Sequence, residues 1–441
     1  MKGKIVKGFS KWSKAEKLAW IAEHLLSDPE KGKEEISSFW HQDAEWQKVL
    51  DGFSENTLSN FPLPFGVAPN FLINGHCYVV PMVIEESSVV AAASNAAKYW
   101  SERGGFHAEV VDMEKVGQVH FYWYGTEERW AGWQDELEER LFARVSTMTQ
   151  NMVKRGGGIL SLEWKHMTDL DDGFRQLSVR FDTRDSMGAN FINSVLEEFA
   201  QGIELFLATR EGLSDTERKV DIIMSILSNY TPDCKVIASV ECPIDKLGEY
   251  PGHMSAEEFA RKFYKAVRIS RMDPYRAVTH NKGIYNGIDA VVIATGNDFR
   301  AIEACGHAFA ARDGQYRGLS NCTLEHGIFK FWLEVPMAVG TVGGLTAVHP
   351  LAKYSLEILG NPSAEELMMI IASMGLAQNF AAVRSLITTG IQYGHMKMHL
   401  QNILHQLGAG TDESEAAKLY FCERTVSFSA VREFLERERA K

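Results

Sequence analysis

The organisation of this chain centres on one stretch, Arg276-Ala-Val-Thr-His-Asn-Lys282-Gly-Ile-Tyr-Asn286-Gly-Ile-Asp-Ala-Val-Val-Ile-Ala-Thr-Gly-Asn-Asp298. A polar, charged segment precedes an apolar run, Ile288 to Thr295, and a second polar turn follows it. The run is short, rich in β-branched residues and bounded by glycines, which predicts a buried strand after a charged loop. Lys282 and Asp298 would meet if that loop folds back. Away from water they would either pair as structural ions or poise one another for proton transfer, and position alone leaves both open.

Length and composition indicate a soluble enzyme with more than one domain. The chain has 441 residues, of which 45% are hydrophobic and 24% charged. One compact core rarely serves so long a chain, so two or more domains are expected. The net charge is -12 and no basic block stands out. Binding to nucleic acid or to an anionic membrane needs clustered Lys and Arg, so neither partner is expected.

The cysteines and the apolar stretches point to the cytoplasm. Six scattered cysteines form no C-x-x-C pair, and buried free thiols in a reducing compartment are expected: Cys77, Cys234, Cys242, Cys305, Cys322 and Cys422. The first eight residues carry charge but lack the apolar core of a signal peptide. The least polar long stretch, Phe331 to Val348, is a poor membrane span because it contains Glu334 and Pro336.

The first hundred residues predict helices, a strand and a polar turn. Residues 8–50 carry apolar side chains at helical spacing, which predicts amphipathic helices in a packing or dimerisation arm. Tyr78 to Ile84 is an apolar strand candidate, and Glu85-Glu86-Ser87-Ser88 then leads into a serine-capped helix from Val89. On the residues alone, Glu86 is a charge that the helix dipole favours.

Residues 113–219 differ from the preceding region, because strands and helices are predicted to alternate there. Strands are predicted at 116–124, 158–164 and 177–182, and helices at 128–151 and 191–211. Between the last of these strands and the last helix stands Thr183-Arg184-Asp185-Ser186-Met187-Gly188-Ala189-Asn190. A strand, a glycine turn and a helix N-terminus can bind phosphate. The Rossmann and Walker A glycine patterns are absent from the sequence, so nucleotide binding is only a weak prediction from these residues.

The region near the C-terminus contains a possible helix start and two histidines. Asn361-Pro362-Ser363 is typical of a capped helix. His395 and His399 are four residues apart and would face one metal ion on a helix, but no glutamate follows the first and no third ligand is spaced nearby. No metal site is predicted, and without further information His395 is an ordinary histidine. The charged segment 432–441 predicts a solvated helix.

Several of these segments resemble one family, the class II (bacterial-type) 3-hydroxy-3-methylglutaryl-CoA reductases. The run DPYRAVTHNKGIYNGIDAVVIATGNDFRAIEA, residues 273–304, is similar to the family's lysine and aspartate segment. The other matching motifs are Glu55-Asn56, Leu63-Pro-Phe-Gly-Val-Ala68, Asn70-Phe-Leu-Ile-Asn-Gly75, Glu85-Glu-Ser-Ser88, Asp185-Ser-Met-Gly-Ala-Asn190, Val339-Gly-Thr-Val-Gly-Gly344 and Gly394-His-Met396. Two departures stand out: Ser59 replaces a usual glycine and Ser87 a usual proline.

The resemblance implies a role for each matching residue. It makes Glu86, Lys282, Asp298 and His395 catalytic, with His395 protonating the departing thiolate of CoA. It makes Ser88, Arg276 and Asn286 substrate contacts, and it makes Asp185, Met187, Gly188 and Asn190 contacts of the nicotinamide cofactor. A physical tension follows, because a helix N-terminus lowers a carboxyl pKa whereas a proton donor needs it raised. Asp298, as a second carboxylate, would raise the pKa of Glu86, and the two acids would titrate with Lys282 as a coupled set.

The implied fold is α+β. It has a large helix-rich substrate domain (1–112 and 220–385), an inserted smaller α/β nucleotide-binding domain that is not a Rossmann fold (113–219) and a C-terminal helical flap (386–441). The implied reaction interconverts the acyl-CoA with mevalonate and CoA by two hydride transfers, in a homodimer or higher even oligomer whose active site lies at the interface. The cofactor is NADPH or NADH. NADPH is favoured because NAD-preferring members of the family carry an aspartate shortly before the triple glycine, whereas residues 149–155 here contain no acidic residue and end in Lys154 and Arg155. The alternative is a catalytically inactive paralogue that binds CoA or a nucleotide.

Overall fold

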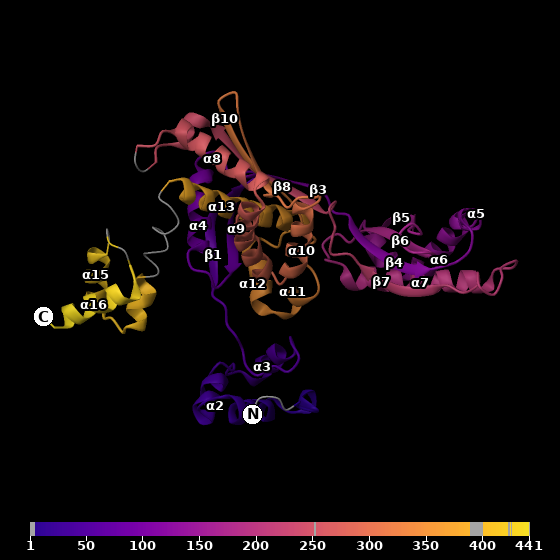
Figure 1. Ribbon diagram of the computed structural model, residues 1–441, viewed down its shortest axis with the longest axis horizontal. Coiled ribbons are helices and arrows are strands. Elements are labelled where there is room, and N and C mark those ends of the chain that lie inside the picture. The colour runs from indigo at the N-terminus through magenta and orange to yellow at the C-terminus, as the bar shows by residue number, and fades with distance from the viewer. Residues whose placement is uncertain (1–4, 251–252, 389–399, 422–423, 425, 441) are drawn as a thin grey trace. The chain divides into compact units, whose positions relative to one another are not determined.

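The computed structural model describes residues 5–250, 253–388, 400–421, 424 and 426–440, and Figure 1 labels its elements. The chain divides into two compact units, residues 1–64 and 65–441. Each unit is considered by itself below.

The first unit is helical, as predicted. Its elements are η1 (Phe9–Lys11), α1 (Lys14–Leu25), α2 (Pro29–Ser38) and α3 (Ala44–Asp51). Each α-helix begins after a residue whose side chain accepts a backbone N–H: Ser13, Asp28 and Asp43. The serine that replaces the family's usual glycine has a structural role here, because the hydroxyl of Ser59 donates a hydrogen bond to the carbonyl of Ile36 at 2.6 Å.

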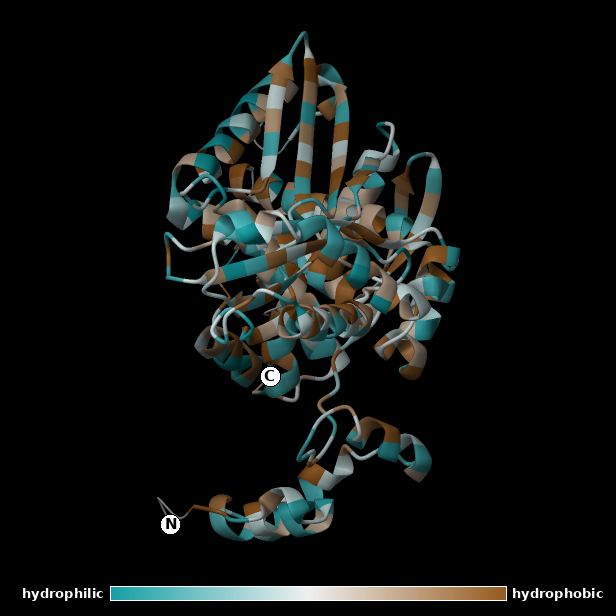
Figure 2. Ribbon diagram, turned by 90° about the vertical axis from the view of Figure 1, so that its right-hand side faces the viewer, coloured by the Kyte–Doolittle hydropathy of each residue, from teal (hydrophilic) through white to brown (hydrophobic). Residues whose placement is uncertain are grey.

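The larger part of the second unit contains a hairpin and a four-stranded antiparallel sheet of order β3-β8-β10-β9. The strands of the hairpin are β1 (Phe65–Ile73) and β2 (His76–Val83), and those of the sheet are β3 (His107–Asp112), β8 (Lys235–Pro243), β9 (Ser320–Glu325) and β10 (Ile328–Pro336). Buried residues alternate with partly or fully exposed ones along most of β8 and β10. In Figure 2, hydrophobic and hydrophilic segments both occur along the strands. One face of this sheet therefore belongs to the core.

Helices pack against that sheet, against the hairpin and against one another, and the longest of them is central. They are α4 (Val89–Ser101), η2 (Ile244–Leu247), α8 (Ala256–Met272), α9 (Pro274–Ala294), α10 (Phe299–Ala310), α11 (Leu345–Val348), α12 (Pro350–Ile358) and α13 (Ala364–Ile387). Ser363 and Glu366 form a capping box at the start of α13, as the sequence predicted. Among the described residues, α13 alone is long and apolar enough to cross a membrane. Of its most apolar 18-residue stretch, 83% is buried inside the protein. It packs against α4, α9 and the sheet, which is the behaviour of a core helix.

The predicted strand at Ile288–Thr295 was wrong, as was the charged loop before it, because both segments are helical and belong to α9. The glycines mark close helix packing rather than strand ends. A Cβ on Gly287 would lie 2.9 Å from the carbonyl oxygen of Met374, and one on Gly375 would lie 2.8 Å from Ile288. A helix that is buried on most sides has no polar face, so its sequence shows a continuous apolar run. Such a run cannot be told from that of a buried strand by periodicity alone.

The smaller part of the second unit is an antiparallel sheet of order β5-β6-β4-β7 with helices packed on it. Its elements are β4 (Lys115–Tyr122), α5 (Glu127–Ala131), α6 (Gln134–Lys154), β5 (Gly158–His166), β6 (Phe174–Asp182), α7 (Ala189–Thr209) and β7 (Asp221–Leu227). All its strand pairs are antiparallel, which confirms that it is not a Rossmann fold. The single helix predicted for 128–151 is interrupted at Gly132 and Trp133.

The C-terminal segment has its own small apolar cluster. Residues 400–406 are helical and are followed by α15 (Thr411–Tyr420) and α16 (Phe428–Arg439). The charged segment predicted as a solvated helix is helical, but the helix is not solvated on all sides, because Val431, Phe434 and Leu435 are buried in one apolar cluster with Leu400 and Phe421. These three residues recur at helical spacing, so α16 is amphipathic.

Three separate hydrophobic clusters lie in the second unit. One runs from Ala68 to Val383, the second from Val119 to Leu213, and the third from Leu400 to Leu435. The division into substrate, cofactor and flap domains stays a prediction. The exact boundaries at 112, 219 and 385 stay predictions.

Candidate functional site

Glu86 lies in the turn between β2 and α4. The next helix begins at Val89, and its N-cap residue is Ser88, as predicted. The cap differs from the expected one, because Ser88 has a φ of 74° and its side chain makes no capping hydrogen bond. Left-handed backbone is costly for a residue with a Cβ, and such strain is concentrated at functional sites. The turn therefore leaves the hydroxyl of Ser88 uncommitted to the helix.

Helix α9 brings two side chains to the carboxylate of Glu86. Lys282 Nζ lies 2.6 Å from Glu86 Oε2, and the amide nitrogen of Asn286 lies 3.4 Å from the same oxygen. The two residues are four apart, so they project from one face of the helix, one turn apart. The Lys282 side chain is 60% exposed and that of Glu86 37%, so a ligand can reach both.

Arg276 is a half-buried cation near the start of the same helix. Burial lowers the pKa of its guanidinium, which still leaves it charged at neutral pH. Its side chain forms no hydrogen bond and no ion pair with any other residue in the described part of the chain, in contrast to Arg175 and Arg180. A half-buried guanidinium without a protein partner is suited to bind an external anion such as a carboxylate.

Asp298 has partners other than the predicted ones. It is the N-cap of α10, and its Oδ1 accepts hydrogen bonds from the backbone nitrogens of Arg300 and Ala301. Both of its oxygens also accept from the guanidinium of Arg300, each at 3.0 Å. Burial by itself would raise the pKa of Asp298, but these hydrogen bonds outweigh it and the pKa is lowered. Within the described residues, Lys282 forms its ion pair with Glu86 and not with Asp298, whose ion pair is with Arg300. The expected pairing of Lys282 with Asp298 is therefore not observed.

A second part of the site is a cavity of about 550 Å³, which Asp298 also lines. The other lining residues are Met148, Asn151, Met152, Arg155, Ser186–Phe191, Gly296, Asn297, Gly340 and Val342–Thr346. The predicted cofactor residues Met187, Gly188 and Asn190 are therefore together at its wall. Gly188 has a φ of 84° and is the N-cap of α7, so the first N–H groups of that helix begin here.

Asp185, the fourth predicted cofactor residue, ties this loop to neighbouring segments. Its carbonyl accepts a hydrogen bond from Thr341 N at 2.8 Å, and its Oδ1 accepts one from Ala364 N at 2.8 Å, at the start of α13. Gly340 makes the approach possible, because a Cβ there would lie 2.4 Å from the backbone nitrogen of Met187. The glycines of 340–344 therefore permit a close backbone approach to the cofactor loop.

Sequence reasoning gave no role to Asn297, which holds the same glycine segment. Its side-chain nitrogen donates to the carbonyl of Gly340 at 3.0 Å, and its side-chain oxygen accepts from the N–H of Gly340 at 2.8 Å. The only signal in the sequence was its position in the polar turn after the apolar run. His395, the fourth predicted catalytic residue, lies outside the described residues.

Comparisons with known proteins identify one family. A family model described as hydroxymethylglutaryl-coenzyme A reductase matches residues 13–400. The chain is 36% identical over 438 residues to the 3-hydroxy-3-methylglutaryl-coenzyme A reductase of Archaeoglobus fulgidus, covering 99% of this chain and 95% of that protein. It is 33% identical over 382 residues to the probable enzyme of Borreliella burgdorferi, covering 85% and 84%.

A solved structure has the same fold. The class II 3-hydroxy-3-methylglutaryl-CoA reductase of Streptococcus pneumoniae, bound to NADPH in open conformations, superposes with a TM-score of 0.69 at 38% identity. The match covers 97% of this chain and 100% of that one. The class II resemblance of the sequence is thereby confirmed, and the chain belongs to the hydroxymethylglutaryl-coenzyme A reductase family.

Proposed function

We propose that this protein interconverts 3-hydroxy-3-methylglutaryl-CoA with mevalonate and free CoA. In the reductive direction the acyl-CoA takes up two hydrides and two protons, and two NAD(P)H are oxidised. The observation that carries the proposal is the exposed Lys282–Glu86 pair, with its 2.6 Å contact, on a helix that also presents Asn286. A cation and a carboxylate in contact supply the two things that carbonyl reduction needs, which are charge stabilisation and a proton.

The proposed catalytic roles follow from where charge develops. Bound NADPH supplies the hydride, and the substrate oxygen becomes negative. Lys282 stabilises that oxygen, and Glu86 helps to protonate it. Asp298 holds Lys282 in place and tunes Glu86, which requires Asp298 to exchange its partner Arg300 for Lys282. His395 gives a proton to the CoA thiolate, so that the thiolate does not add back to the aldehyde.

The proposed substrate contacts are Arg276, Ser88 and Asn286. Arg276 binds the free carboxylate of the substrate, because its half-buried guanidinium is otherwise unpaired among the described residues and can bond two carboxylate oxygens. Ser88 and Asn286 hydrogen-bond the acyl part. Ser88 is suited to this because its hydroxyl does not cap the helix that follows it.

The cavity beside Asp298 fits a dinucleotide. Its volume of about 550 Å³ is within the usual range for ligand sites. Met187, Gly188 and Asn190 would hold the cofactor at the N-terminus of α7, where backbone N–H groups favour phosphate, and Asp185 would fix the loop. Arg155 lines the same cavity, and a guanidinium there favours the 2′-phosphate of NADPH over the free hydroxyl of NADH. The Streptococcus pneumoniae enzyme described above is bound to NADPH, which supports NADPH as a cofactor here.

We further propose a cytoplasmic homodimer, or a higher even oligomer, with the active site at the subunit interface. Large apolar side chains remain exposed near the catalytic helix, including Tyr275 at 90% and Val278 at 56%, and Phe61 in the first unit is 90% exposed. Apolar surface of this kind is typical of protein–protein contacts. The described cysteines are all free, which suits a reducing compartment. Light scattering on the purified protein would measure the oligomeric state directly.

The comparisons give the inactive paralogue no support. The test of the proposed function is nicotinamide absorbance, followed with the acyl-CoA and either NADPH or NADH in parallel. Oxidation that depends on the acyl-CoA, at two cofactors per CoA released, is the expected result, and it should be faster with NADPH. No oxidation with either cofactor, together with no reduction in the presence of mevalonate and CoA, would overturn the proposal.

A further inference from the structure

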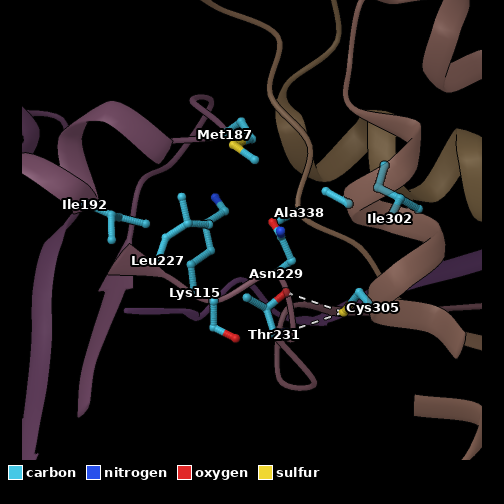
Figure 3. A pocket seen from close by; sticks show the side chains of 11 residues that line it. Lys115, Met187, Ile192, Leu227, Asn229, Thr231, Ile302, Cys305 and Ala338 are labelled. Atoms are coloured by element: carbon cyan, nitrogen blue, oxygen red, sulfur yellow. Dashed lines mark hydrogen bonds between the residues drawn. The ribbon is translucent and has the colours of Figure 1, made fainter. Parts of the chain in front are cut away.

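A lysine that plays no part in the chemistry described above is buried beneath the cofactor loop. Lys115 is the first residue of β4 and is 2% exposed. Its ammonium donates to Thr183 Oγ1 at 2.6 Å and to the carbonyl of Ser186 at 3.2 Å. In Figure 3 the side chain extends toward the segment that carries Met187. Lys115 therefore supports the loop that leads into α7.

The buried charge of Lys115 is not neutralised by a carboxylate. It forms no ion pair with any residue that the structure describes, and burial lowers its pKa, although the negative charges of Asp182 and Asp185 act in the opposite direction. The nearby thiol of Cys234 stays neutral, because burial raises its pKa to about 12. An unpaired buried cation costs folding free energy, so it calls for a compensating role.

The hydrogen bonds of Lys115 do not provide that compensation. Thr183 Oγ1 itself donates to the carbonyl of Ser186 at 2.6 Å, so this carbonyl keeps a partner without the lysine. The backbone nitrogen of Ser186 also bonds the carbonyl of Thr183 at 3.0 Å, which closes the turn independently. A neutral side chain of the same length would remove the donor to Thr183 Oγ1, but the hydroxyl would keep its own hydrogen bond to the carbonyl of Ser186 and the turn would stay closed.

The position of the charge suggests what it acts on. Thr183 lies directly beneath Gly188, because a Cβ on Gly188 would be 2.5 Å from Thr183 Cγ2. Gly188 is the N-cap of α7 and lines the cofactor cavity, whereas Lys115 lines a small separate cavity of about 10 Å³ on the inner side of Met187. Charge placed beneath a helix N-terminus adds to the field of the helix and favours an anion there.

We infer that Lys115 is a positioning residue for the cofactor, one that places a buried positive charge beneath the N-terminus of α7 and thereby favours the diphosphate of NADPH there. This inference rests on the proposed function, because that function puts the cofactor in this cavity. Lys115 acts through the loop and does not touch the ligand. The unpaired charge lowers the stability of the ligand-free protein, and its attraction to the bound diphosphate offsets this loss of folding free energy.

The test compares Lys115→Met, which removes the charge and keeps the length, with the wild type. NADPH affinity, measured by fluorescence titration, should fall about tenfold, as expected for one charge acting through protein at close range. The melting temperature of the ligand-free variant should equal or exceed that of the wild type. The KM for NADPH should rise while the KM for the acyl-CoA stays the same. Lys165→Met, which removes a partly exposed lysine of β5, is the matched control and should change none of these values.

Each outcome has a definite meaning. ADP-ribose, which carries the diphosphate, should lose affinity in Lys115→Met as NADPH does, whereas adenosine 2′-monophosphate should not. Equal binding of NADPH by both proteins would overturn the inference alone. So would a lower melting temperature or failure of the variant to fold, because Lys115 would then be a structural support. Wild-type protein that binds neither NADPH nor NADH would overturn the proposed function and the inference with it.

Discussion

Two acidic turns lie before helices in this protein, and they use their carboxylates differently. Glu86 precedes α4 and Asp298 precedes α10, and their side chains are almost equally exposed, at 37% and 38%. Glu86 bonds side chains of α9, whereas Asp298 bonds the backbone of its own helix and the guanidinium of Arg300. Burial therefore does not distinguish the two acids, and their partners do.

The difference depends on backbone geometry. Asp298 is itself the N-cap, so its oxygens reach the first N–H groups of α10. Glu86 stands two residues before the N-cap Ser88, whose left-handed backbone begins the helix without a side-chain cap. The carboxylate of Glu86 is thereby free to contact Lys282. In this structure the acid that caps a helix is bonded to its own helix, whereas the acid just outside the cap is bonded to a neighbouring helix.

Removing the lysine that contacts Glu86 should give the largest effect. Lys282→Ala should lower kcat by about 10³-fold, because the developing oxyanion loses the cation that stabilises it. The free energy of unfolding should change by less than about 1 kcal/mol, since the pair is exposed to solvent. Turnover and urea unfolding would be measured side by side. Lys98→Ala, at an exposed position of α4, is the control and should leave both unchanged. Normal turnover in Lys282→Ala would refute the mechanism.

The second acid can be tested with two replacements. Asparagine caps helices as well as aspartate does, so Asp298→Asn should keep the stability of the protein, whereas Asp298→Ala should lose about 1 kcal/mol. If Asp298 also holds Lys282 during catalysis, both variants should lose activity by about 10²-fold. Full activity in Asp298→Asn would mean that Asp298 is only a helix cap, and the contrast between the two turns would then be complete.

Cofactor preference should respond to the cation that lines the cavity. Arg155→Asp replaces a guanidinium with a carboxylate, which should repel the 2′-phosphate and accept the free ribose hydroxyls of NADH. The ratio of kcat/KM for NADPH to that for NADH should fall about tenfold or more. Lys165→Asp reverses the charge at a partly exposed site of β5 and should leave the ratio the same. An unchanged ratio in Arg155→Asp would place the 2′-phosphate elsewhere.

The smallest expected effect concerns Asp289, a third acid, about two turns further along α9 than Lys282. Burial raises the pKa of Asp289 to about 8, and the neighbouring carboxylate of Glu303 adds to the shift. The folded state thus holds a proton that the unfolded chain releases near pH 4, so stability falls as pH rises through the range up to about 8. Asp289→Asn should remove this dependence and raise the free energy of unfolding at pH 9 by about 1–2 kcal/mol.

Urea unfolding of the wild type and of Asp289→Asn at pH 6 and pH 9 would measure this pH dependence of the free energy of unfolding. The control is Asp245→Asn at an exposed position. Parallel pH profiles for Asp289→Asn and the wild type would show that Asp289 does not carry the proton.

The sequence predicted a large part of the fold and indicated the residues of the site, but not their contacts. Helix starts at Ser363 and after Gly188, and the strands β4, β5 and β6 of the smaller sheet, depend on neighbouring residues and could be found from the sequence. The helical structure of the apolar half of α9 could not be predicted from the sequence. Asp273-Pro274 marks the start of this helix, but the predicted strand began beyond it, and the run itself carries no helical polar stripe. Its burial against α13 removed the periodicity on which such a prediction depends.

The sequence by itself determined the chemical groups of this protein: an acid before a helix, a lysine and an amide one turn apart, and a glycine turn before a helix N-terminus. Only the tertiary structure decided which groups meet. It joined Lys282 to Glu86 and placed Lys115 beneath the cofactor loop. Residue types and local spacing fix short-range structure, whereas these contacts span up to 196 positions along the chain. Their geometry depends on how helices and sheets pack, and no local pattern encodes it.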